Sequence, residues 1–504
     1  MKRPNILLIT SDQQHWNTLG VLNPEIRTPR LDALAAQGTL FERAYCPNPT
    51  CTPTRASMIT GTYPSQHGAY SLGTKLDERK HTVGEDFRAA GYRTALIGKA
   101  HFQPLAGTPE FPSLEAYPTL QDLDFWRGFH GPFYGFEHVE LARNHTDEPH
   151  VGQHYAIWLE ERGCANWRDY FRKPTGPADY DLQRFRWAIT ERFHYNVWIA
   201  EKTNAQLAEA AAQGQPFFCW ASFFDPHPQC MAPEPWDTMY DPAALTLPRL
   251  RPGEHDRNPP HFRLTQEDSP DFSAYYVPDG HRLHGMFSHR CDEAYLRRTL
   301  AVYYGMVSLL DKYVGVILDR LAQLGLAEDT LVVFTSDHGH FLGQHGLVAK
   351  GPFHYEDMLR VPFIVRWPGH VPAGRRSTAL QSLVDLPQTF LSFCGIPEPR
   401  GMTGVNQRAV WEGHATRARD HVLVENNHQP WTVDLRTYVD ERWKLTVYLN
   451  RPYGELFDLR DDPGEFNNRW DDPDYAAVKS ELLLKFLHAE MAREPIPMPR
   501  VHGA

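Results

Sequence analysis

The 504-residue sequence predicts an α/β fold, in which helices flank a doubly wound, mostly parallel sheet and a smaller C-terminal α+β domain follows. Three observations lead to this prediction. Short apolar runs alternate with helical segments, as expected for parallel strands buried on both faces. Four of these runs end in polar residues, where open α/β sheets bind their ligands. From about residue 417 the pattern changes to short strands in series and one helix, which is typical of an antiparallel α+β domain.

The first strand is predicted over residues 6–10, which form a continuous apolar run. A helix is predicted over residues 28–37, because Thr28 is a suitable N-cap, Pro29 suits the first helical position and Gly38 comes just past the end. Further helices are predicted from Cys51 to near Gly61, over 82–90 and over 295–324, and further strands over 94–97, 216–224 and 331–335.

The C-terminal part is predicted to contain strands over 422–425, 432–439, 443–449 and 455–459 and a closing amphipathic helix over 475–491. Strands in series followed by a helix indicate a small domain of their own. We therefore predict a catalytic domain over residues 1–412 and a C-terminal domain over residues 413–504.

Composition excludes several classes of protein. The formal net charge of −11 argues against a nucleic acid or an anionic membrane as partner. The seven scattered cysteines do not form a disulfide framework and suit a reducing compartment. The apolar run near the N-terminus is too short for a signal peptide, and no apolar run is expected to span a membrane. We therefore predict a cytoplasmic protein.

Polar residues follow four predicted strands at the point where each strand ends. They are Asp12 and Gln13, Lys99 and His101, His227, and Asp337 and His338. Two carboxylates, an amide oxygen and an imidazole could together hold a divalent cation with oxygen-rich coordination. A single aspartate after a strand is more often a helix cap. The gathering of all seven residues at one edge is what favours a functional site.

The most distinctive stretch is residues 49–61, with the sequence PTCTPTRASMITG. Its two prolines make the approach to Cys51 rigid, and the following helix N-terminus favours anionic ligands. Arg55, one helical turn on, adds a planar fork suited to an oxyanion. A C-x-P-x-R string alone is weak support, and a small buried cysteine in a turn is the alternative.

The whole stretch resembles the signature of the formylglycine-dependent type I sulfatases of the alkaline phosphatase superfamily, and the resemblance extends over essentially the whole chain. It implies an alkaline phosphatase-like fold and oxidation of Cys51 to formylglycine by a maturation enzyme. It also implies one divalent cation, with the ligands Asp12, Gln13, Cys51, Asp337 and His338. Many members have Asp in place of Gln13 and Asn in place of His338. These two differences lower the negative charge of the site. Ca²⁺ remains the first expectation, but Mn²⁺ and Mg²⁺ are alternatives.

The activity that the resemblance implies is hydrolysis of a small-molecule sulfate monoester of an aryl, carbohydrate or small alcohol. A hydroxyl of hydrated formylglycine, activated by the cation and Arg55, attacks sulfur to give a covalent sulfated intermediate, and the second hydroxyl allows sulfate to leave. His101 matches the family's base and His227 its acid. Lys99 and Lys350 match the lysines that neutralise the sulfate oxygens.

Two other functions are left open. A sister branch hydrolyses phosphonate monoesters or phosphodiesters and shares the Asp-Gln and Asp-His metal pairs, but it generally lacks the Gly-Lys-x-His motif of residues 98–101, so we favour a sulfatase. A binding module with unmodified Cys51 is the other alternative. Residues 105–195 and 240–290 are expected either to line the substrate pocket or to form surface and oligomer contacts, so a homo-oligomer is also left open.

Overall fold

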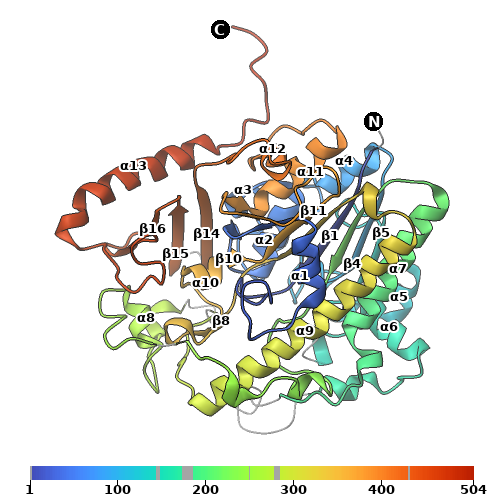
Figure 1. The fold of residues 1–504 in the computed structure, drawn as a ribbon, viewed down its shortest axis with the longest axis horizontal. Coiled ribbons are helices and arrows are strands. Elements are labelled where there is room, and N and C mark those ends of the chain that lie inside the picture. Colours follow the sequence, from blue (N-terminus) through green and yellow to red (C-terminus); the bar gives the residue numbers. More distant parts are fainter. Residues whose placement is uncertain are drawn as a thin grey trace.

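An eight-stranded sheet forms the centre of the larger part of the molecule (Figure 1). The computed structural model describes residues 3–143, 148–172, 185–248, 250–276, 284–429 and 432–503. The strand order is β12-β2-β11-β7-β1-β6-β4-β5. The bounds are β1 Asn5–Ser11, β2 Thr39–Phe41, β4 Arg93–Gly98, β5 His138–Leu141, β6 Phe217–Ser222, β7 Thr330–Ser336, β11 Phe363–Arg366 and β12 Arg375–Ser377.

Five neighbouring strands of this sheet are parallel. β1 pairs with β6 and β7, and β4 pairs with β6 and β5. Thr10 and Gly98 both lie opposite Ser222, and Ser11 lies opposite Ser336. The carboxyl ends of β1, β4, β6 and β7 therefore meet at one edge of the sheet. On the far side of β7, β11 runs antiparallel, so the sheet is mostly but not wholly parallel.

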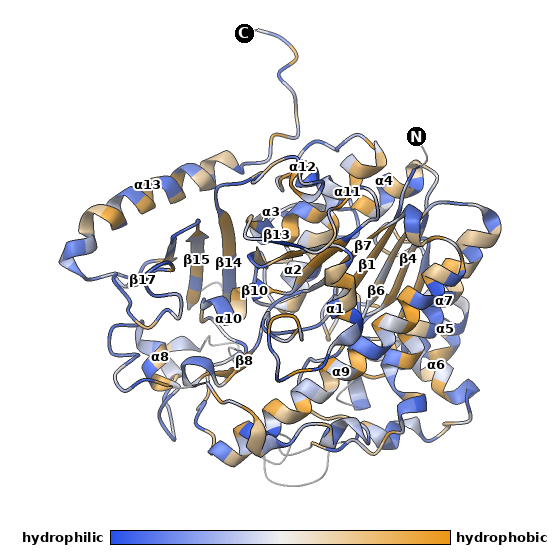
Figure 2. Cartoon of the chain, in the orientation of Figure 1, coloured by the Kyte–Doolittle hydropathy of each residue, from blue (hydrophilic) through white to orange (hydrophobic). Residues whose placement is uncertain are grey.

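Both faces of the sheet are buried at its centre, which explains why β1 and β7 are mostly continuous apolar runs (Figure 2). Along β1, Ile6 and Leu8 belong to one hydrophobic cluster, whereas Leu7 and Ile9 belong to another on the opposite face. The two clusters together bury most of the apolar side chains of the sheet. The predicted α/β class is confirmed.

Helices cover each face, as in a doubly wound fold (Figure 1). One cluster includes apolar residues of α1 Pro29–Ala36, α7 Tyr195–Gln213 and α9 Glu293–Gln323. The other cluster includes residues of α2 Cys51–Thr60, α4 Val83–Ala89 and α11 Leu386–Cys394. Shorter elements complete this part: β3 Ala44–Tyr45, β8 Phe341–Leu342, β9 Val348–Ala349, β10 Arg360–Val361, β13 Gln381–Ser382, α3 Pro64–His67, α5 Leu123–Gly128, α6 Gln153–Glu161, α8 Pro260–Leu264, α10 Glu356–Leu359 and α12 Arg408–Trp411.

The helix α9 corrects one expectation from the sequence. By length and composition it is sufficiently apolar to cross a membrane, which we did not expect of any segment. However, 83% of its most apolar 18-residue window is buried inside the structure. The helix lies against α7, α1 and the sheet, as the core helix of a globular domain does.

The C-terminal part is a second, antiparallel sheet in the order β14-β15-β16-β17, as predicted. Its strands are β14 Val422–Gln429, β15 Val433–Val439, β16 Trp443–Tyr448 and β17 Gly454–Asp458, and the helix α13 Ala476–Ala492 follows. Leu482 and Phe486 of α13 pack with Leu423, Tyr438 and Leu445 of the sheet. The boundary between residues 412 and 413 stays a prediction.

Candidate active site

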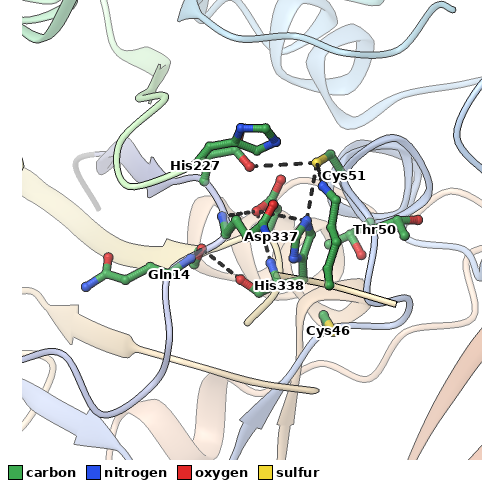
Figure 3. Close-up of polar contacts among 12 residues, drawn as sticks. Gln14, Cys46, Thr50, Cys51, His227, Asp337 and His338 are labelled. Carbon is green, nitrogen blue, oxygen red and sulfur yellow. Dashed lines mark hydrogen bonds and ion pairs between the residues drawn. The ribbon is translucent and has the colours of Figure 1, made fainter. Parts of the chain in front are cut away.

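The predicted polar residues lie together beyond the carboxyl ends of β1, β4, β6 and β7, beside the start of α2. Figure 3 shows Cys51, His227, Asp337 and His338 of this group. The sheet order places these four strands side by side, so residues that are far apart in sequence become neighbours. The edge rule for α/β sheets therefore locates the candidate site. Lys350 reaches the same place from the segment after β9.

Cys51 is the first residue of α2 and is fully buried at the centre of the group. Its Sγ lies 3.2 Å from His338 Nε2, 3.2 Å from Lys350 Nζ and 3.7 Å from Asp12 Oδ1 (Figure 3). Burial opposes ionisation, but the positive charges of Lys350 and Lys99 outweigh it and hold the pKa of the thiol well below its ordinary value. Position 51 is therefore an electropositive site that favours an anion.

Arg55 ties three strand ends together one helical turn after Cys51. Its Nε donates to Asp337 Oδ2 at 2.9 Å, and its Nη1 donates to Ser222 Oγ at 2.7 Å and to the Lys99 carbonyl at 3.0 Å. The guanidinium is fully buried, and such a charge is tolerated only when it is paired and hydrogen-bonded. Arg55 thus fixes the ends of β7, β6 and β4 around the site.

Four of the five predicted metal ligands converge. Asp12, Cys51, Asp337 and His338 offer ligand atoms that all lie within 4.8 Å of one another. His338 Nδ1 lies 2.9 Å from the Gly339 carbonyl, which can only accept, so the ring hydrogen belongs on Nδ1. The lone pair of Nε2 then faces Cys51, as a metal ligand requires. Cys51 Sγ is the ligand atom that position 51 contributes to this group.

Gln13, the fifth predicted ligand, has a left-handed backbone with φ of 57°. This conformation is held by its N–H, which donates to Asp337 Oδ1 at 2.9 Å, and by its carbonyl, which accepts from the Tyr303 hydroxyl at 2.8 Å. The side-chain Nε2 lies 2.7 Å from His340 Nδ1, whereas the buried Oε1 has no hydrogen-bond partner. A buried amide oxygen without a hydrogen-bond partner fits a cation ligand.

The two predicted lysines face anionic groups at the site. Lys99 Nζ forms an ion pair with Asp12 Oδ2, and Lys350 Nζ contacts the Cys51 sulfur. Although burial opposes it, Lys99 lowers the pKa of Asp12. Both lysines are more than 90% buried, so their charges act in a low-dielectric environment.

His101 lies on a strained turn beyond β4. Its φ is 58°, and its N–H donates to Glu115 Oε1 at 2.8 Å. Burial, assisted by the positive charge of Arg143, holds the pKa of His101 well below its ordinary value, so the ring is a neutral base at neutral pH.

His227, beyond β6, is half-buried. Its Nδ1 is in hydrogen-bond contact with the Pro228 carbonyl, which fixes the ring orientation. Burial lowers its pKa below the ordinary value, although Asp12 opposes this shift. A protonated His227 would therefore be a stronger acid than an exposed histidine.

A pocket of about 300 Å³ opens onto these residues. It is lined by Cys51, Leu72, Gly73, Lys99, His101, Leu105, Arg143, His227, His284 and Lys350. Leu105 and Arg143 come from the first long region singled out in the sequence, and His284 comes from the second. Both regions therefore contribute pocket walls. Sequence reasoning did not identify Arg143, or Glu115, which holds the turn at His101.

Comparisons with known proteins agree with this geometry. A family model described as Sulfatase matches residues 4–396, and a model described as N-sulphoglucosamine sulphohydrolase, C-terminal, matches residues 343–492.

Two relatives and one solved structure resemble the chain over nearly its whole length. The chain is 28% identical to the "Uncharacterized sulfatase YidJ" of Escherichia coli, over 96% of this chain and 86% of that protein. It is 27% identical to an arylsulfatase of Clostridium perfringens, over 97% of this chain and 94% of that protein. A phosphonate monoester hydrolase of Agrobacterium radiobacter has a similar structure, with a TM-score of 0.79 and 26% identity over 99% of this chain and 100% of that one.

Proposed function

Because this chain belongs to the sulfatase family, we propose that it hydrolyses a sulfate monoester of an aryl, carbohydrate or small alcohol at position 51. The observation that carries this proposal is the convergence of Lys99 and Lys350 on Cys51 at the pocket. The ammonium groups of these two buried lysines and the buried guanidinium of Arg55 make the site strongly positive, which suits a sulfate group. The named arylsulfatase relative supports a sulfuric ester hydrolase.

Members of this family generally use a metal ion and formylglycine, and the residues present fit both. Asp12, Gln13, Asp337 and His338 would hold the ion, together with the modified residue 51. A divalent cation supplies Lewis-acid activation at this position when it is bound. Two carboxylates, an amide oxygen and an imidazole suit Ca²⁺ first, with Mn²⁺ or Mg²⁺ as alternatives. Conversion of Cys51 requires a maturation enzyme as partner.

The residues around position 51 can then share the remaining work. Lys99 and Lys350 bind the sulfate oxygens and neutralise their charge. His101 is neutral and borders the same pocket as Cys51, so it can accept a proton from the nucleophile. His227 lies on the same pocket and can return a proton to the departing alcohol. Arg55 holds the Asp337 carboxylate in place through an ion pair of 2.9 Å.

A second candidate function is hydrolysis of phosphonate monoesters or phosphodiesters. It is favoured by the structural similarity to a phosphonate monoester hydrolase and by the metal pairs Asp12-Gln13 and Asp337-His338. Against it stand Lys99 and His101, which that branch generally lacks.

The test compares kcat/KM for an aryl sulfate and for an aryl phosphonate monoester on one preparation, in which mass spectrometry has verified the conversion of Cys51. Cys51→Ala provides the background. We expect a preference for the sulfate that is abolished in Cys51→Ala. A preference for the phosphonate would favour the second candidate, and thiol alone at position 51 after co-expression with a maturation enzyme would favour a binding module. A cytoplasmic location, the absence of nucleic-acid and membrane partners, and the oligomeric state stay predictions.

A further inference from the structure

Arg143 is a buried cation that borders the active-site pocket. Apart from its effect on the pKa of His101, it has no role in the proposed reaction. It follows β5, the strand next to β4, and it lines the same pocket as Cys51 and Lys99. Its side chain is only 5% exposed. Burial lowers the pKa of the guanidinium, as expected for a charge that is only partly compensated.

The carboxylate nearest to Arg143 is already occupied by other donors. Glu115 Oε1 accepts from the His101 N–H, and Oε2 accepts from the N–H groups of Phe102 and Gln103, each at 2.8 Å. Arg143 Nε lies 4.0 Å from Oε1, which is too far for a hydrogen bond. Among the described residues, Glu115 is the ion-pair partner of Arg143, and Arg143 Nε is buried without a hydrogen-bond partner. A planar donor fork therefore remains available at the pocket wall.

The other cations at the pocket have their own anionic partners. Lys99 pairs with Asp12, and Lys350 contacts the Cys51 sulfur, so these two lysines serve the sulfate position. A sulfate monoester carries a single negative charge, which these lysines already meet. Keeping a further buried guanidinium at the wall is costly unless a ligand supplies an anion there.

The pocket has room for an alcohol that carries such a group. Its volume of about 300 Å³ lies at the lower end of small-molecule sites and can hold one ring. Leu72 and Leu105 give it an apolar side that suits the body of a ring. We propose, on the basis of the proposed sulfatase function, that Arg143 forms a subsite for a second oxyanion, a carboxylate or a second sulfate, on the alcohol part of the substrate.

A purely structural role is the competing explanation. Arg143 could serve only to neutralise Glu115, which holds the turn at His101. In that case its loss would affect every substrate equally. A subsite would instead change the preference between charged and neutral substrates, mainly through KM.

The experiment uses three ring-substituted nitrophenyl sulfates of similar size, which carry a carboxylate, a sulfonate or a neutral carboxamide. With the Cys51-converted enzyme we expect kcat/KM for one of the anionic probes to exceed that for the carboxamide by about 10- to 100-fold, the range for hydrogen bonds to a charged group. Arg143→Met should reduce this ratio to near one, and Arg143→Lys should retain part of it. The better anionic probe identifies the kind of oxyanion.

Glu115→Gln is the matched control, because it disturbs the turn at His101 while keeping the cation. It should lower kcat/KM for the neutral carboxamide probe. The ratio should stay at least as high as before, because the variant also removes the carboxylate that partly compensates Arg143. An unchanged ratio in Arg143→Met would overturn the proposal. A ratio near one in the Cys51-converted enzyme that keeps Arg143 would also overturn it.

Failure of the proposed function is distinguishable, because no probe would then be hydrolysed by the converted enzyme. Calorimetric titration of Cys51→Ala with the carboxylate and carboxamide nitrophenols would still test the subsite. Tighter binding of the carboxylate that is lost in Cys51→Ala/Arg143→Met would support the subsite, and equal binding would overturn it.

Discussion

Replacing Arg55 by methionine tests the most deeply buried charge of the candidate site. The guanidinium is fully buried, and it joins Asp337, Ser222 and Lys99 through hydrogen bonds of 2.7 to 3.0 Å. Methionine keeps much of the side-chain volume but leaves the Asp337 carboxylate without this partner. Removing one partner of a buried ion pair costs about 3–5 kcal/mol.

This cost translates into a measurable change of melting temperature. With an unfolding entropy of about 2.1 cal/mol/K per residue, a chain of 504 residues has about 1 kcal/mol/K, so Tm should fall by about 3–5 °C. Scanning calorimetry would measure this on enzyme freed of divalent ions by a chelator, because a bound cation would replace part of the lost positive charge.

Arg162→Met is the matched control. Arg162 pairs with Glu201 on the surface, where the side chains are 41% and 44% exposed. Such exposed pairs contribute about 1 kcal/mol or less, so Tm should move by about 1 °C or less. If Arg55→Met lowered Tm no more than this control, the idea that Arg55 compensates buried carboxylates would be refuted.

Three further predictions concern the metal site, the pH dependence of stability and the backbone. His338→Asn should keep ion binding and His338→Leu should lose it, because only Asn retains an uncharged ligand atom for the metal. Metal content would be measured after dialysis, and equal content in the two variants would show that His338 is not a ligand. Burial raises the pKa of Asp225 to about 7, so its contribution to stability is present below about pH 4 and is lost as pH rises through about 7. Asp225→Asn should therefore flatten the dependence of Tm on pH in this range. An unchanged profile would contradict the raised pKa of Asp225. Gly98→Ala should lower both Tm and kcat/KM, because the φ of Gly98 is +106° and an added Cβ would lie 1.9 Å from the Ser222 carbonyl oxygen. The control Gly91→Ala, with φ of +83° and open space around the added Cβ, should cost only about 1–2 kcal/mol of stability. Equal losses of stability in the two variants would argue against the close contact at Gly98.

The strands of the sheet centre were predictable because their burial on both faces makes them continuous apolar runs. The run at residues 6–10 became β1 Asn5–Ser11, and the run at residues 331–335 became β7 Thr330–Ser336. The strands β5 and β11 were not predicted. Each has only four residues, which is too short for a clear hydrophobic period, and β11 also pairs with β2, which is distant in the sequence.

The position of the site was predictable from the strand ends, whereas the residues that support it were not. The ends of four strands predicted where Asp12, Lys99 and Asp337 would meet. Glu115 could not be predicted, because its role depends on three backbone N–H groups of a turn that is known only from the fold. Arg143 follows the carboxyl end of β5, so the edge rule would have found it if β5 had been recognised.

The charge of the proposed metal site bears on the role of Arg143. Because Gln13 and His338 are neutral, the carboxylates of Asp12 and Asp337 only offset the charge of a divalent cation. The cations Arg55, Lys99 and Lys350 then exceed the single negative charge of a sulfate monoester, and Arg143 adds to this excess at the pocket wall. Charges in a buried pocket interact strongly over such short separations. Neutral metal ligands and a partly compensated Arg143 therefore act in the same direction, and both favour a substrate that carries more negative charge than one sulfate group.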